Sequence, residues 1–114
     1  MTPMLRIDID RHGTASVVTP RGDIDMGSSP ALRDHLRRAQ ESRPERLVID
    51  LSSVEYMDSS GLATLVEAMK YARTQKTRLI LAALQPRVRA IFEIARLHQF
   101  FTIVPGVSEA LEQG

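Results

Sequence analysis

The sequence predicts a small α/β domain in which a mixed β-sheet of about four to five strands carries helices mainly on one face. Three observations favour this fold. The chain begins with apolar residues at every second position, which is typical of a half-buried strand. Two short apolar runs at 47–51 and 78–83 suit strands that are covered on both faces. Apolar residues at helical spacing separate these runs, and a strand–helix–strand order favours parallel strands with a right-handed connection.

The N-terminal segment predicts two antiparallel strands. Leu5, Ile7 and Ile9 alternate with charged residues, so we expect a strand with one buried face. His12 and Gly13 predict a tight turn, because glycine tolerates positive φ. The stretch 14–19 then predicts the second strand, which Pro20 and Gly22 should close.

The first helix is predicted from its start signal and its apolar spacing. Ser29 suits the N-cap and Pro30 suits the first helical position, where a missing N–H costs nothing. Leu32 and Leu36 follow at helical spacing, and we expect the helix to end within 42–44.

The middle of the chain predicts a parallel unit of strand, helix and strand. The strand at 47–51 leads into a loop over 52–61, and a second buried strand covers 78–83. Between them lies the clearest helical stripe of the chain, formed by Leu62, Leu65, Val66 and Met69.

The C-terminal part predicts two further helices around a short strand. A helix starts at Pro86, a strand covers 101–104, and a short last helix covers 108–112 with Ser108 as a candidate cap. A chain of 114 residues is the size of one domain, so we expect 1–114 to form a single unit.

Composition excludes several classes of function. Fifteen Lys and Arg against fourteen Asp and Glu give a net charge of +1, which is too balanced to favour nucleic-acid binding. The absence of cysteine excludes disulfides, thiolate nucleophiles and Cys-ligated metals. We find no N-terminal targeting segment and no apolar run of the roughly 20 residues that cross a bilayer. We therefore expect a soluble cytoplasmic protein with no direct membrane insertion.

No cofactor, metal site or catalytic centre is expected. His12, His35 and His98 lie on different predicted elements, without the spacing of metal ligands. There is no glycine-rich phosphate loop, and Ser59 lacks the glycine two positions before it that a hydrolase nucleophile elbow needs. A small hydrolase using Ser59 or Ser60 is therefore disfavoured.

The segment 56–62 is the most informative part of the chain. It places Asp58, Ser59, Ser60 and Gly61 where a buried strand turns into a helix. Free N–H groups at such a point attract anions, so a functional site is one interpretation. The other is structural: Asp58 or Ser59 caps the helix and Gly61 permits close packing.

The chain resembles the STAS domains that sulphate transporters share with anti-sigma factor antagonists. The resemblance depends on the segments 48–54 and 57–62, with Asp-Ser-Ser-Gly-Leu as its specific core, and on 22–25 followed by 29–32. It extends from about the first strand to the last helix and implies a STAS-like fold.

The resemblance implies a protein that regulates transcription by switching partners. An unphosphorylated antagonist binds an anti-sigma factor that is also a serine kinase, and thereby frees a sigma factor. The kinase phosphorylates the serine that matches Ser60, with Ser59 the less favoured alternative, and a separate serine phosphatase restores the first state. Asp25 matches an acidic residue of the docking surface.

The expected partner-binding surface is larger than this serine. Asp23, Asp25 and Asp58 could make it acidic, and Ser59 lies beside Ser60. The second helix could add a flat docking strip, although an ordinary solvated face is an equal alternative. The strip consists of Gly61, Thr64, Ala68 and Tyr71.

Another function within the same family stays open. Some STAS proteins are unswitched subunits of bacterial lipid-transport ABC complexes or of stress-signalling scaffolds. Such a subunit would carry no phosphate on Ser60. The oligomeric state, including self-association, is also open.

Overall fold

Five strands form one sheet, and their order in the sheet is their order in the chain. The computed structural model describes residues 5–112; the N-terminal residues 1–4, in which no targeting segment is expected, lie outside this range. β1 pairs with β2 in antiparallel fashion, and β2, β3, β4 and β5 are parallel to one another. The strands are β1 (Arg6–His12), β2 (Ala15–Arg21), β3 (Arg46–Asp50), β4 (Arg78–Ala82) and β5 (Thr102–Val104).

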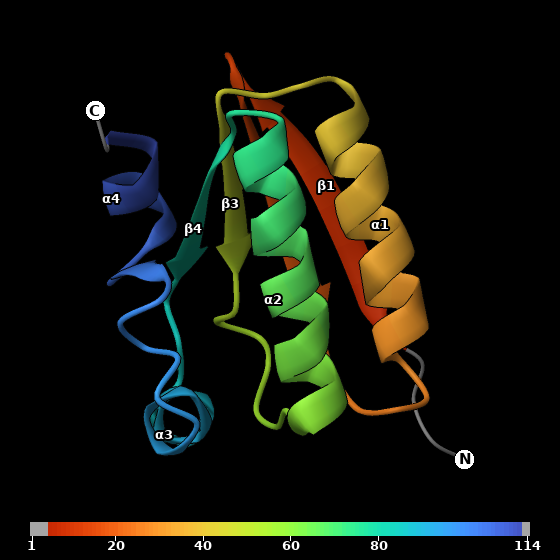
Figure 1. The fold of residues 1–114 in the computed structure, drawn as a ribbon, viewed down its shortest axis with the longest axis vertical. Coiled ribbons are helices and arrows are strands. Elements are labelled where there is room, and N and C mark those ends of the chain that lie inside the picture. The colour runs from red at the N-terminus through yellow and green to blue at the C-terminus, as the bar shows by residue number, and fades with distance from the viewer. Residues whose placement is uncertain (1–4, 113–114) are drawn as a thin grey trace.

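Four helices alternate with the later strands, which confirms the predicted order of elements. They are α1 (Ser29–Glu41), α2 (Ser59–Thr74), α3 (Pro86–Ile94) and α4 (Val107–Glu112). Figure 1 shows α1 and α2 side by side across one face of the sheet, with their N-termini at the same end. Among the described residues, no helix has the length and apolarity that crossing a membrane requires.

Each face of the sheet has its own apolar core. Side chains of α1, α2 and α3, such as Leu36, Leu65 and Phe92, pack with Ile49 of β3 on one face. On the other face, Val48 of β3 packs with a smaller cluster that includes Ala110 of α4. Consecutive residues of β3 therefore serve opposite cores, because side chains alternate along a strand. Among the described residues, the helices lie mainly on one face, as predicted, and α4 lies on the other.

Two loops at one end of the sheet are joined by backbone hydrogen bonds. Ile24, which follows β2, donates its N–H to Tyr56 O at 3.0 Å and accepts from Asp58 N at 3.1 Å. The Ile24 side chain is fully buried. This pairing holds the segment before α1 against the segment before α2, and it positions the candidate site.

The N-terminal strands and the first helix differ from prediction in three details. Ile9 is 41% exposed rather than buried. β2 continues through Pro20, because β3 pairs with β2 only as far as Val18 and the missing N–H costs no bond to β3. The N-cap of α1 is Ser28 rather than Ser29, and its side chain makes no capping bond to the helix.

Three boundaries in the C-terminal part also differ. β4 ends at Ala82 because Ala83 adopts a φ of 59°, which is incompatible with a strand. β5 begins one residue later than predicted, at Thr102. Ser108 lies inside α4 and is not its cap, since that helix begins at Val107.

Candidate functional site: a serine at the start of α2

Asp58 caps α2. Its backbone is extended, and its carboxylate accepts the N–H of Ser60 at 2.9 Å and the N–H of Gly61 at 3.3 Å. The carboxylate thereby satisfies the N–H of Ser60 and shares that of Gly61 with the Asp58 carbonyl, which lies 3.1 Å from Gly61 N. The structure thus selects Asp58, rather than Ser59, as the cap.

Ser60 is the second residue of α2 and is partly exposed. Its hydroxyl donates a hydrogen bond to Asp58 Oδ1, so the side chain has a defined orientation. Ser59, the first residue of the helix, is more exposed. Both hydroxyls lie at a helix N-terminus, where the helix dipole and free N–H groups favour negative charge.

The pKa of the Asp58 carboxyl is lowered below its ordinary value of 3.8. The largest cause is the hydrogen bond from the Ser60 hydroxyl; the N–H groups of Gly61, Ser60 and Met26 act in the same direction, and desolvation opposes them. Asp58 is therefore a carboxylate at neutral pH, and a fixed negative charge adjoins the Ser60 oxygen.

The predicted acidic residues of the preceding loop have separate roles. The carboxylate of Asp25 is used within the loop: Oδ1 accepts from Gly27 N at 2.9 Å and from Ser28 N at 3.1 Å. The side chain of Asp23 is exposed. The pairing of Ile24 with Asp58 brings this loop beside the start of α2, so the structure brings the two predicted segments together.

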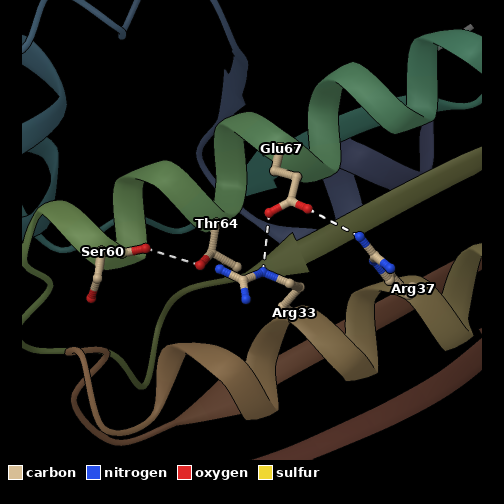
Figure 2. Close-up of polar contacts among 5 residues, drawn as sticks. All are labelled: Arg33, Arg37, Ser60, Thr64 and Glu67. Carbon is tan, nitrogen blue, oxygen red and sulfur yellow. Dashed lines mark hydrogen bonds and ion pairs between the residues drawn. The ribbon is translucent and has the colours of Figure 1, made fainter.

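The predicted docking strip on α2 is mostly buried, which corrects that part of the sequence analysis. Thr64 is 1% exposed, Ala68 is 7% exposed, and Gly61 is also buried. Only Tyr71 is exposed, at 43%. Figure 2 shows Thr64 directed to Ser60, whose carbonyl accepts its hydroxyl at 2.9 Å. Thr64 and Ala68 lie on the side of α2 that packs along α1, and Gly61 packs against Met57 and Ile24.

Gly61 has a packing role. A Cβ atom at this position would lie 2.5 Å from Met57 Cγ and 2.8 Å from Ile24 Cγ2. Both distances are too short for real Cβ contacts. The absent side chain therefore lets α2 begin directly over the two joined loops.

Charged side chains connect α1 with α2 further along the helices. Glu67 accepts from Arg33 at 3.0 Å and from Arg37 at 3.1 Å (Figure 2). The side chains are 42–66% exposed, so solvent screens these ion pairs and they contribute little to stability.

Comparison with known proteins identifies the family. Residues 6–110 match the STAS domain. The chain belongs to the STAS domain family. The anti-sigma-B factor antagonist of Listeria monocytogenes is 37% identical over 100 residues, which cover 87% of this chain and 88% of that relative.

Solved structures share the fold of this STAS domain. The crystal structure of an anti-sigma factor antagonist from Mycobacterium paratuberculosis superimposes with a TM-score of 0.89 at 28% identity, covering 98% of this chain and 97% of that one. The Bacillus cell-fate determinant SpoIIAA in its phosphorylated form has a TM-score of 0.71 at 18% identity, covering 94% and 97%.

Two exposed apolar side chains of this STAS domain were missed by the sequence analysis. Met26 is 78% exposed in the loop before α1, and Tyr56 is 45% exposed in the loop before α2. The signal for Met26 was an apolar residue between Asp25 and Gly27 in a predicted loop.

Among residues 5–112 of the STAS domain, no histidine hydrogen-bonds to Ser59 or Ser60, and His35 Nδ1 lies 2.7 Å from Ala31 O. Within the same range, no three His, Asp or Glu side chains come together in a way that could hold a metal ion.

Proposed function

We propose that this chain is an anti-sigma factor antagonist that binds an anti-sigma factor with serine-kinase activity and is released by phosphorylation on Ser60. The observation that carries the proposal is the Ser60 hydroxyl, which is partly exposed at the N-terminus of α2 and oriented by Asp58. The names of the Listeria relative and the Mycobacterium structure support the partner class. SpoIIAA, a protein of the same fold, exists in a phosphorylated form.

Phosphorylation at this position is compatible with the fold. Transfer of the γ-phosphoryl group of ATP joins phosphorus to Ser60 Oγ, releases the hydroxyl proton and leaves ADP. The phosphate adds roughly −1.5 to −2 units of charge at neutral pH. Because Ser60 is the second residue of α2, the helix dipole favours that charge.

The phosphate changes the local pattern of hydrogen bonds. Ser60 Oγ loses the proton that it donates to Asp58, and two negative groups then adjoin each other. The phosphate oxygens can accept N–H groups of the first helical turn in place of the carboxylate. The helix therefore keeps a cap, and the added charge acts chiefly on whatever contacts this surface.

The main effect of the phosphate is on the affinity for the bound partner. An unpaired charge at an interface that excludes water costs several kcal/mol, and about 1.4 kcal/mol corresponds to a tenfold loss of affinity. In this proposal the chain is a regulatory binding protein and not a catalyst. The kinase is the anti-sigma factor, and a separate serine phosphatase removes the phosphate.

The test compares Ser60→Glu with Ser60→Ala. We expect Ser60→Glu to bind the anti-sigma kinase at least tenfold more weakly, because its charge mimics part of the phosphate. Ser60→Ala should bind like the unmodified protein and accept no phosphate. Isothermal titration calorimetry with the anti-sigma kinases of the host organism measures affinity, and intact mass after incubation with ATP measures modification.

Ser59→Ala is the matched control, since it removes the neighbouring hydroxyl and leaves the cap intact. It should still be phosphorylated on Ser60. Equal affinities of folded Ser60→Ala and Ser60→Glu would contradict the switch. Stable co-purification with a lipid-transport complex or a stress-signalling scaffold, with Ser60 unmodified in cells, would instead favour an unswitched STAS subunit.

A further inference from the structure

Met26 is a large apolar side chain that is 78% exposed beside the candidate site. It lies in the loop between β2 and α1, which is otherwise formed by polar residues, glycine and the buried Ile24. A single exposed apolar residue needs no explanation by itself. The structure of the loop makes this one different.

The backbone on both sides of Met26 is fixed by hydrogen bonds. On the C-terminal side, Asp25 Oδ1 accepts from Gly27 N at 2.9 Å and from Ser28 N at 3.1 Å. The Ser28 hydroxyl donates to Asp23 O at 2.9 Å and closes the loop.

On the N-terminal side, Ile24 is fully buried and its N–H and C=O are bonded to the segment before α2. Met26 therefore projects from a backbone that is already ordered. A partner that binds it does not need to order this loop, so less conformational entropy is lost on binding.

The surroundings of Met26 are acidic and adjoin Ser60. The Met26 N–H is one of the groups that lower the pKa of Asp58, and Asp58 in turn accepts the Ser60 hydroxyl. Asp23 is exposed in the same loop, and Tyr56 is 45% exposed in the loop that pairs with it. Met26 thus lies in a loop that contains Asp23 and Asp25, and its backbone N–H adjoins the Asp58 carboxylate.

We infer that Met26 is the apolar anchor with which this chain binds its anti-sigma factor, and that the partner offers an apolar pocket bordered by basic side chains. The inference rests on the proposed function. Methionine is unbranched and polarizable, so it fits irregular pockets well. Binding energy concentrates in a few residues that enter such pockets, while surrounding polar contacts contribute less.

The charges favour this partner over other occupants of the surface. In a two-fold contact with a second copy centred on Met26, the carboxylates of Asp23 and Asp58 would lie close to those of that copy, which disfavours association. An anionic membrane surface would be repelled by the same carboxylates. A protein surface with an apolar pocket and a basic border complements both features.

The test uses Met26→Ala with Ile94→Ala as its matched control. Ile94 is 84% exposed and lies at the end of α3, outside the hydrogen-bonded loops. Binding to the host organism's anti-sigma kinases is measured by isothermal titration calorimetry, and folding is checked by thermal denaturation. We expect about a tenfold loss of affinity for Met26→Ala and less than about a twofold change for Ile94→Ala. Met26→Leu should retain most of the affinity, because it keeps the apolar volume.

The outcomes separate this inference from the proposed function. If Met26→Ala binds like the unmodified protein while Ser60→Glu does not bind, Met26 is not the anchor, and the proposed phosphorylation switch is still supported. Equal losses in Met26→Ala and Ile94→Ala would also overturn the anchor. If the unmodified protein binds none of the anti-sigma kinases, the proposed function fails and the anchor fails with it.

Discussion

The Asp58 carboxylate links the folding of α2 to the state of Ser60. It accepts two backbone N–H groups of the first helical turn and the Ser60 hydroxyl. The sequence restricts the cap to Asp58 or Ser59, because both residue types are common caps. The sequence does not decide between them, because the choice depends on tertiary structure. The hydrogen bond from Asp58 N to Ile24 O fixes where the chain enters the helix.

We predict that Asp58→Ala lowers the free energy of unfolding by about 1 kcal/mol, the usual cost of a lost N-cap. Asp58→Asn should lower the free energy of unfolding much less, because an asparagine oxygen caps helices about as well as a carboxylate. Urea denaturation at neutral pH measures both variants. Equal losses in the two variants would show that the charge, and not the capping oxygen, stabilises the helix start.

The unmodified protein and Asp58→Asn should also differ in how their free energy of unfolding depends on pH. The pKa of Asp58 is lower in the folded chain than its ordinary value of 3.8, so the unfolded chain binds this proton more readily. The contribution of the charged cap is therefore complete above about that value and is lost as pH falls through the folded pKa. The difference in unfolding free energy between the unmodified protein and Asp58→Asn should shift against the unmodified protein as pH falls below 3.8. A constant difference from pH 6 to 3 would contradict this.

Gly61 gives a second prediction at the level of the residue. Gly61→Ala adds a Cβ atom 2.5 Å from Met57 Cγ and 2.8 Å from Ile24 Cγ2, both in buried side chains. Overpacking costs about 1–3 kcal/mol, and the better helix propensity of alanine returns about 1 kcal/mol. We expect a net loss of stability in thermal denaturation. Gly27→Ala is the control, since its Cβ would meet only Asp25 Oδ1 at 3.4 Å, and it should be near neutral.

At the level of the element, three helices end in the same way. Arg43, Lys76 and Arg96 each follow the C-cap of a helix and have φ values of 49°, 58° and 59°. After α2, Lys76 N donates to Arg73 O and Thr77 N donates to Ala72 O, which satisfies carbonyls at the end of the helix. Glycine is the usual residue at this left-handed position, because it has no Cβ to strain.

We predict that Lys76→Gly raises the free energy of unfolding by about 1 kcal/mol, because the left-handed conformation costs other residues about 1–2 kcal/mol. The charge of Lys76 is also lost, so Lys76→Ala is the control: it removes the charge and keeps the Cβ. In chemical denaturation, the free energy of unfolding of Lys76→Gly should be higher than that of the unmodified protein. That of Lys76→Ala should be equal to it or lower. The reverse order would mean that the charge at the helix end outweighs the backbone strain.

The elements themselves could be predicted from sequence, and their boundaries less well. The stripe of Leu62, Leu65 and Met69 predicts α2 because these side chains must face a core, and all three are buried. The predicted end of the second strand at Pro20 was wrong, because the cost of a proline depends on which neighbour the strand has at that point. Register between strands is a tertiary property that no local pattern contains.

At the scale of the whole molecule, the packing of α1 against α2 decides which side chains a partner can reach. Thr64 and Ala68 have the small size of docking residues, and the sequence left open whether they face solvent or a partner. The structure uses them to bring two helices close together, and both are buried. Met26 and Tyr56 are instead exposed on the two loops before α1 and α2, and the placement of these loops depends on the pairing of Ile24 with distant backbone.

The order of the strands has a consequence for how the protein is made. Since every strand neighbours its predecessor in the chain, a nascent polypeptide that leaves the ribosome amino end first can add each new strand to an edge that already exists. No completed part of the sheet has to open to admit a later segment. The last strand and α4 then close the second core.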